Sequence, residues 1–165
     1  MLVYYRLFCH NIQTVFLKWR FMGATAYVDG SYNIATGVFS YGIVFFTGAV
    51  DKDGNRQELH FSKAFEHAEL AEMRNVAGEI MGSAQAMKIA DKLNLTELTI
   101  FHDYEGIAKW CTGEWKAKKA WTQKYRDFYL EISQRIQITF VKVKGHSNDK
   151  YNDLADELAR KAAGN

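Results

Sequence analysis

The chain has few cysteines, no proline and no long apolar run, and two of these shortages exclude whole classes of protein. Two cysteines, Cys9 and Cys111, are too few for a disulfide framework, and neither belongs to a CxxC pair that could hold zinc. We expect reduced thiols in a cytoplasmic protein. No hydrophobic stretch continues unbroken for the roughly 18 to 20 residues that a membrane span requires, so no membrane association is expected.

An excess of charge of one sign is also lacking. Lys and Arg total 21 and Asp and Glu total 19, which leaves a net charge of +2. This balance excludes a polybasic tail but not a local basic patch. The 165 residues, 48% hydrophobic and 24% charged, are typical of a single globular domain. We expect a monomer.

Residues 1–22 differ from the remainder of the chain. They are apolar but interrupted by polar and charged residues such as Arg6, Asn11 and Lys18, and they lack the cleavage site of a signal peptide. An extra strand, an upstream extension and an arm for interactions all stay open. We therefore divide the chain into an N-terminal extension of unknown role, residues 1–22, and a single domain, residues 23–165.

Hydrophobic periodicity predicts alternating elements from residue 23 onward. The expected strands are 24–28, 38–46, 57–61, 98–101 and 136–143, and the expected helices are 75–93, 107–110, 122–134 and a last one around 154–162. Residues 29–31 are expected to turn the chain after the first strand. Three hairpin-type strands followed by β–α alternation predict an α/β fold, with a mixed sheet that is antiparallel at one edge and covered by helices.

Certain acids lie where such a sheet binds ligands. Asp29 and Asp103 each end an expected strand, and parallel neighbouring strands bring their carboxyl ends together at the ligand-binding edge of an α/β sheet. Other roles stay open for each acid alone. Asp29 could form a turn, Asp103 could cap a helix, and Glu79, on the expected helix 75–93, could be a solvated surface residue.

Four motifs, taken together, resemble a known family. They are AYVDGSYN at 26–33, RNVAGEIMGSAQAM at 74–87, LTIFHDYEGIAKW at 98–110 and KGHSNDKYNDLADELARKAAG at 144–164. In this order they are similar to type 1 ribonuclease H, also called ribonuclease HI, and in particular to the catalytic domain of its bacterial, viroplasmin-type branch. The resemblance implies the ribonuclease H-like fold, a five-stranded mixed sheet of order 3-2-1-4-5 with helices on both faces.

The resemblance also implies a set of four metal-binding and catalytic acids. They match Asp29, Glu79, Asp103 and Asp156 of this chain, and in the family such acids hold two Mg²⁺ ions, for which Mn²⁺ can substitute. Asp156 fits the family pattern of Ala-Asp before a Leu-Ala pair better than Asp153, which we interpret as a first-turn acid favoured by the helix dipole. Mg²⁺ prefers oxygen ligands, so carboxylates are the appropriate residue type.

Further residues match the family less sharply. His146 matches a histidine that assists proton transfer or product departure, although an ordinary exposed loop histidine stays open. Expected contacts to substrate are Gly30, Ser31, Asn33, Asn75, Lys116, Lys118 and Lys119. A turn at Asn33, a helix cap at Asn75 and a simple amphipathic helix around the lysines remain alternatives.

The function that the resemblance implies is an endoribonuclease that hydrolyses the RNA strand of RNA:DNA hybrids and leaves 5′-phosphate and 3′-hydroxyl ends. Two metal ions supply the nucleophile and stabilise the leaving oxygen in such a reaction. Exonucleases with an Asp-x-Glu motif are disfavoured, because Ser31 stands where that glutamate would be. A catalytically weak hybrid-binding module of the same fold is the alternative.

Overall fold

The computed structural model describes residues 23–145 and 149–165. The predictions for residues 1–22 and for His146 lie outside the described residues. The elements are β1 (Ala24–Tyr32), β2 (Phe39–Val50), β3 (Arg56–Phe65), α2 (Ala68–Ala71), α3 (Asn75–Lys92), β4 (Glu97–His102), α4 (Gly106–Thr112), α5 (Ala120–Ile132), β5 (Gln137–Lys142) and α6 (Lys150–Ala163).

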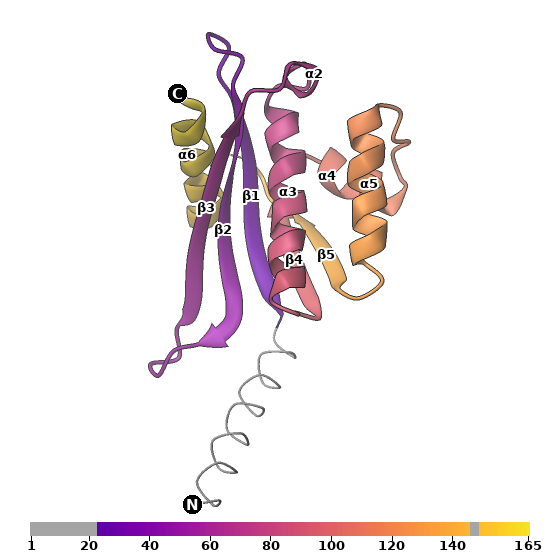
Figure 1. Ribbon diagram of the computed structural model, residues 1–165. Helices are drawn as coiled ribbons and strands as arrows, with labels where there is room; N and C mark the ends of the chain where they lie inside the picture. The colour runs from indigo at the N-terminus through magenta and orange to yellow at the C-terminus, as the bar shows by residue number, and fades with distance from the viewer. Residues whose placement is uncertain (1–22, 146–148) are drawn as a thin grey trace, which may run out of the picture.

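The five strands form one mixed sheet of order β3-β2-β1-β4-β5. The β1–β2 and β2–β3 pairs are antiparallel, whereas β1–β4 and β4–β5 are parallel. Helix α6 packs on one face, against β1, β2 and β3, and α3 packs on the other face beside α4 and α5 (Figure 1). The predicted fold class and strand order are therefore confirmed.

The first strand is longer than predicted. Asp29, Gly30 and Ser31 do not turn the chain but continue β1, paired with Gly42, Tyr41 and Ser40 of β2. The turn prediction was wrong because the ladder to β2 overrides the local preference of Asp and Gly for turns. The chain reverses only over residues 33–37, where the Gly37 N–H donates to the carbonyl of Asn33 at 2.8 Å.

The main core lies between the sheet and α3. Ala24, Ala26 and Val28 alternate along β1 and point towards this helix, which contributes Ile80 and Met87. Full burial of an aliphatic side chain of this size contributes about 1.5–3 kcal/mol. The small residues on β1 allow α3 to approach the sheet closely.

Helix α6 lies equally close to the opposite face. A side chain at Gly42 would collide with the backbone of α6 at Ala155, so β2 accepts the helix only because this position is glycine. Ser40 Oγ donates to the Ala159 carbonyl at 2.5 Å and ties the two elements together. Asp149 caps the start of α6 by accepting from the N–H groups of Tyr151 and Asn152.

Residues 23–145 and 149–165 contain no helix whose length and apolarity would allow it to cross a bilayer.

Candidate active site

Three of the four predicted acids converge in space. Asp29 lies on β1, Glu79 on α3, and Asp103 directly follows β4. One carboxylate oxygen from each residue lies within 4.8 Å of those of the other two. The convergence expected at the carboxyl ends of the two central parallel strands is therefore present.

Each acid reaches this place through the local structure. Asp29, only 7% exposed, accepts the Gly30 N–H at 2.6 Å. Glu79 is only 2% exposed. Helix α3 lies directly on β1 at Gly30, where any side chain would strike the helix backbone, and this close contact buries Glu79. Asp103 lies two residues before Glu105, the N-cap position of α4.

The structure thus decides between the roles that the sequence left open for these acids. Asp29 is a mid-strand residue and not part of a turn. Asp103 does not occupy the cap position of the helix that follows it. Glu79 is a buried residue and not a solvated one.

Burial and mutual repulsion raise the free energy of the ionised acids. Burial, followed by the charge of Asp103 and then of Asp156, raises the pKa of Asp29 to about 8, although the Gly30 N–H acts in the opposite direction. Burial also raises the pKa of Glu79 well above its usual range, together with the charges of Asp29 and Asp103 and a hydrogen bond to Asp103. The cluster therefore disfavours negative charge unless a cation is added.

The donor set fits such a cation. Glu79 Oε2 is buried without a hydrogen-bond partner in the described residues. In residues 23–145 and 149–165, neither Asp29 nor Glu79 forms an ion pair with lysine or arginine. Converging carboxylate oxygens without protein counter-charges are the ligands that Mg²⁺ and similar hard cations prefer.

Asp156 lies close to this group but outside its tight centre. It is half-buried on α6, and its charge contributes to the raised pKa of Asp29. Asp153, one turn earlier, is exposed in the first turn of the helix. This placement favours Asp156 as the fourth acid. Sequence reasoning missed Asn152, which lies one helical turn before Asp156 and is buried with its Oδ1 unpartnered in the described residues.

A surface hollow of about 560 Å³ has one of the four acids, Asp156, in its wall. It is lined by Gly30, Ser31, Tyr32, Ile34, Arg74, Asn75, Asp156, Arg160 and Asn165. Asn75 is the first residue of α3, whose N-cap Arg74 makes no side-chain capping bond. Three predicted contact residues, Gly30, Ser31 and Asn75, therefore share this hollow. Sequence reasoning missed Arg74 and Arg160, although Arg160 follows Asp156 by one helical turn.

Asn33 is used within the fold. Its Oδ1 accepts from the N–H groups of Ala35 and Thr36 at 2.9 and 3.3 Å. Its Nδ2 donates to the carbonyls of Ala163 and Gly164 at 3.2 and 3.1 Å. These contacts match the turn alternative and also anchor the end of α6.

The three predicted lysines lie together on one loop. Lys116, Lys118 and Lys119 are exposed between α4 and α5. Of the neighbouring tryptophans, Trp110 packs against the main core and Trp121 against a smaller cluster, whereas Trp115 is 37% exposed.

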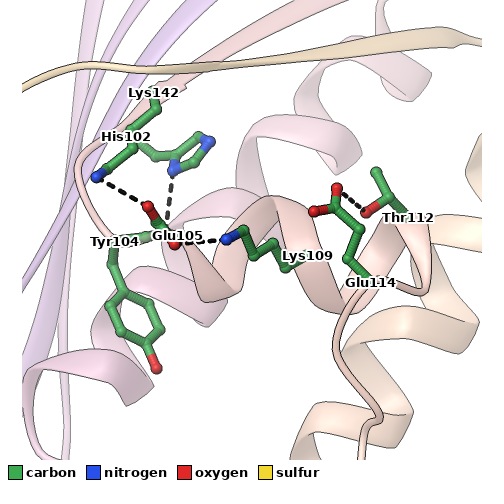
Figure 2. A network of polar contacts seen from close by, with 7 residues as sticks. All are labelled: His102, Tyr104, Glu105, Lys109, Thr112, Glu114 and Lys142. Carbon is green, nitrogen blue, oxygen red and sulfur yellow. Dashed lines mark hydrogen bonds and ion pairs between the residues drawn. The ribbon is translucent and has the colours of Figure 1, made fainter.

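A paired carboxylate lies two residues from Asp103. Glu105 contacts Lys109 Nζ at 2.6 Å and Lys142 Nζ at 3.1 Å (Figure 2). Hydrogen bonds from these lysines lower the pKa of Glu105 below its usual range. Beside them the His102 Nδ1 lies 3.0 Å from the Tyr104 carbonyl, so both flanks of Asp103 are fixed.

The sheet order and the acids that β1, α3 and the end of β4 bring together define a class: α/β proteins with an acidic site for divalent cations. The RNase H family model matches residues 22–164. The chain therefore belongs to the ribonuclease H family, and the motifs place it with the type 1 enzymes, the endoribonucleases of RNA:DNA hybrids.

Individual relatives agree with this assignment. The chain is 29% identical over 149 residues to ribonuclease H of Pseudoalteromonas translucida, a match covering 84% of this chain and 88% of that protein. A match to ribonuclease H of Chlorobium luteolum is 40% identical over 59 residues but covers only 34% of this chain and 40% of that protein.

Solved structures show the same fold. The N-terminal RNase H domain of a Mycobacterium tuberculosis protein has a TM-score of 0.69 at 22% identity, covering 87% of this chain and 94% of that one. LC11-RNase H1 in complex with an RNA/DNA hybrid has a TM-score of 0.61 at 21% identity, covering 84% of this chain and 98% of that one.

Proposed function

We propose that this chain hydrolyses the RNA strand of RNA:DNA hybrids at the centre formed by Asp29, Glu79 and Asp103, with Asp156 as the fourth acid. The observation that carries the proposal is the convergence of three carboxylates, none of which pairs with a lysine or arginine within residues 23–145 and 149–165. Family membership supports the substrate class, as does the LC11-RNase H1 complex with an RNA/DNA hybrid.

The acids have a defined chemical task. Divalent cations held there, two Mg²⁺ or in their place Mn²⁺, would activate the attacking water and stabilise the leaving 3′ oxygen. Asp29 is suited to a central position in this site, because the charges of both Asp103 and Asp156 raise its pKa. The products would carry 5′-phosphate and 3′-hydroxyl ends. His146, outside the described residues, is proposed to assist proton transfer.

The hollow beside the acids supports a place for the hybrid. Gly30 and Ser31 at the end of β1, and Asn75 at the start of α3, are proposed to face its minor groove, where Asn can both donate and accept. The exposed lysines 116, 118 and 119 are proposed to contact phosphates. Asn33 is a weaker candidate, because its amide already bonds to the backbone.

The cellular setting is also a proposal. We infer a monomer that works in the cytoplasm on hybrids without membrane association, as the composition predicts. Residues 23–165 form the catalytic domain, and residues 1–22 an extension whose role the proposal leaves open.

A gel assay with matched duplexes tests the function. The purified full chain is incubated with end-blocked RNA:DNA, RNA:RNA and DNA:DNA duplexes, each with Mg²⁺ and with EDTA. Internal cuts in the RNA of the hybrid alone, only with Mg²⁺, are expected. Cleavage of a hybrid with free ends but not of the end-blocked hybrid would indicate an exonuclease, and hybrid binding without metal-dependent cleavage would identify a binding module.

A further inference from the structure

A buried chain of hydroxyl groups joins three helices beside the acid cluster. The Tyr125 hydroxyl on α5 lies 2.8 Å from Ser83 Oγ on α3 and donates to the Ile107 carbonyl on α4 at 3.1 Å. Tyr125 is only 3% exposed, so both of these hydrogen bonds are shielded from water.

These polar groups lie in an otherwise apolar core. Tyr125, Ile107 and Cys111 belong to the main hydrophobic cluster, together with Ile80 and Met87 of α3. Phenylalanine and alanine of nearly the same shape would fill this space without needing a partner for a buried hydroxyl. Burial alone therefore gives no reason for the hydroxyls.

The two ends of this series of hydrogen bonds, Ser83 and Ile107, each lie four residues after one of the acids. Ser83 follows Glu79 by four residues, which places both on the same face of α3. Ile107 follows Asp103 by four residues, at the start of α4. Tyr125 therefore links the helix that carries Glu79 to the helix that follows Asp103, although α5 contributes no acid to the cluster.

The electrostatics agree with this link. Burial raises the pKa of Tyr125 well above its usual range, and the charges of Cys111 and Glu79 act in the same direction. The hydroxyl therefore keeps its proton and remains a hydrogen-bond donor.

We propose that Tyr125 is a positioning residue for the acid cluster: its hydroxyl fixes α3 against α4 and thereby sets the separation of Glu79 and Asp103. The inference rests on the proposed function, because this separation matters only if the two acids share cations. Groups that orient metal ligands without contacting the metal commonly change affinity or activity by about 10- to 100-fold.

Calorimetric titration of the full chain with Mg²⁺, without substrate, tests the link. Tyr125→Phe removes the hydroxyl, and Ser83→Ala removes its partner while leaving the tyrosine in place. Both are expected to weaken Mg²⁺ binding on the order of 10-fold. The Mg²⁺ concentration for half-maximal hybrid cleavage should rise by the same factor, while KM for the hybrid stays unchanged.

Two controls on α5 separate positioning from stability. Tyr129→Phe removes a hydroxyl one turn later, and in the described residues that hydroxyl makes no hydrogen bond. Ile132→Val trims a buried side chain at the end of the helix and should lower the melting temperature. Both controls should bind Mg²⁺ like the unaltered chain.

The outcomes distinguish the two proposals. If Tyr125→Phe and Ser83→Ala melt earlier but bind Mg²⁺ like the unaltered chain, the residue is only structural and the inference is overturned. If Tyr125→Phe does not fold, Ser83→Ala decides alone. If the unaltered chain itself neither binds Mg²⁺ nor cuts the hybrid, the proposed function is overturned and the inference falls with it.

Discussion

Helix α3 carries one acid at each end, and the two acids have opposite surroundings. Asp91, near its C-terminal end, receives two hydrogen bonds from the Arg135 guanidinium at 2.6 and 2.9 Å, and these lower its pKa. Glu79, near the N-terminal end, is buried beside Asp29 and Asp103, and its pKa is raised. Among the described residues, an arginine pairs with the first acid, whereas no lysine or arginine pairs with the second.

The difference teaches where an external cation is needed. Exposed pairs such as Asp91–Arg135 contribute little to stability and need no further cation. Carboxylates that are buried without a partner destabilise the folded protein when they are ionised. A cluster of them therefore indicates a binding site. Glu105, close to Asp103 but held by two lysines, shows that the contrast does not follow from position alone.

The largest expected effect comes from removing an acid of the unpaired set. Asp29→Asn should reduce cleavage of an RNA:DNA hybrid on the order of 10³-fold or more, because a ligand of the metal centre is lost. The matched control is Asp91→Asn, which removes a paired acid and should leave kcat within about twofold. Similar losses in both variants would contradict the distinction between the two sets.

A smaller effect is expected at the edge of the cluster. Asp156→Asn should lower kcat about 10- to 100-fold, because this acid lies near Asp29 but outside the tight centre. Asp153→Asn, one turn earlier and exposed, should change kcat less than about twofold. Steady-state kinetics at saturating Mg²⁺ make the comparison, and the reverse order would reassign the fourth acid.

The affinity for Mg²⁺ should depend on pH in a direction set by Asp29. The pKa of this acid is about 8 without a cation, so below pH 8 a proton must leave before a metal binds. Calorimetry should therefore show binding that weakens about tenfold per unit between pH 7.5 and 6.5 for each proton displaced. An affinity that is constant over this range would mean that Asp29 is already ionised.

The smallest expected effect comes from the same comparison made for lysine side chains, some paired with an acid and others not. Lys109 and Lys142 are paired with Glu105, whereas residues 23–145 and 149–165 provide no ion pair for Lys116, Lys118 or Lys119. Replacing these three by alanine should weaken hybrid binding several-fold and reduce its salt dependence, with kcat unchanged. Lys92→Ala, exposed on the last turn of α3, is the control. Unaltered salt dependence in the triple variant would exclude phosphate contacts by this loop.

Much of the fold follows from periodicity and from the family resemblance that the four motifs carry. The strand order and the helices on both faces were predicted, and the structure confirms them. The extent of β1 could not be predicted, because Asp29, Gly30 and Ser31 favour turns locally and only the pairing with β2 makes them strand. The four-residue helix α2 was missed, since it is too short for a periodic signal.

The candidate site also consists of residues that the sequence predicts and residues that only the structure reveals. Motifs predicted Asp29, Glu79 and Asp103 as one group, and the structure brings them together. Periodicity alone would have left Glu79 on the surface, because its burial depends on the contact of α3 with Gly30 of β1. Arg74 and Asn152 lie within the quoted motifs but have no assigned role there, and Tyr125 lies outside all four motifs, so only three-dimensional proximity reveals them.

The most direct test of the account is thermal melting of the unaltered chain and of Asp29→Asn at pH 8.5, each with and without Mg²⁺. Folding raises the pKa of Asp29 from 3.8 to about 8, so its stabilising contribution is complete below pH 3.8 and lost as pH rises through 8. Without metal, Asp29→Asn should therefore melt at a higher temperature than the unaltered chain. Mg²⁺ should raise the melting temperature of the unaltered chain by several degrees and that of the variant far less. A variant that melts lower without metal, or an unaltered chain that Mg²⁺ does not stabilise, would contradict the claim that the fold brings these acids together to bind a cation.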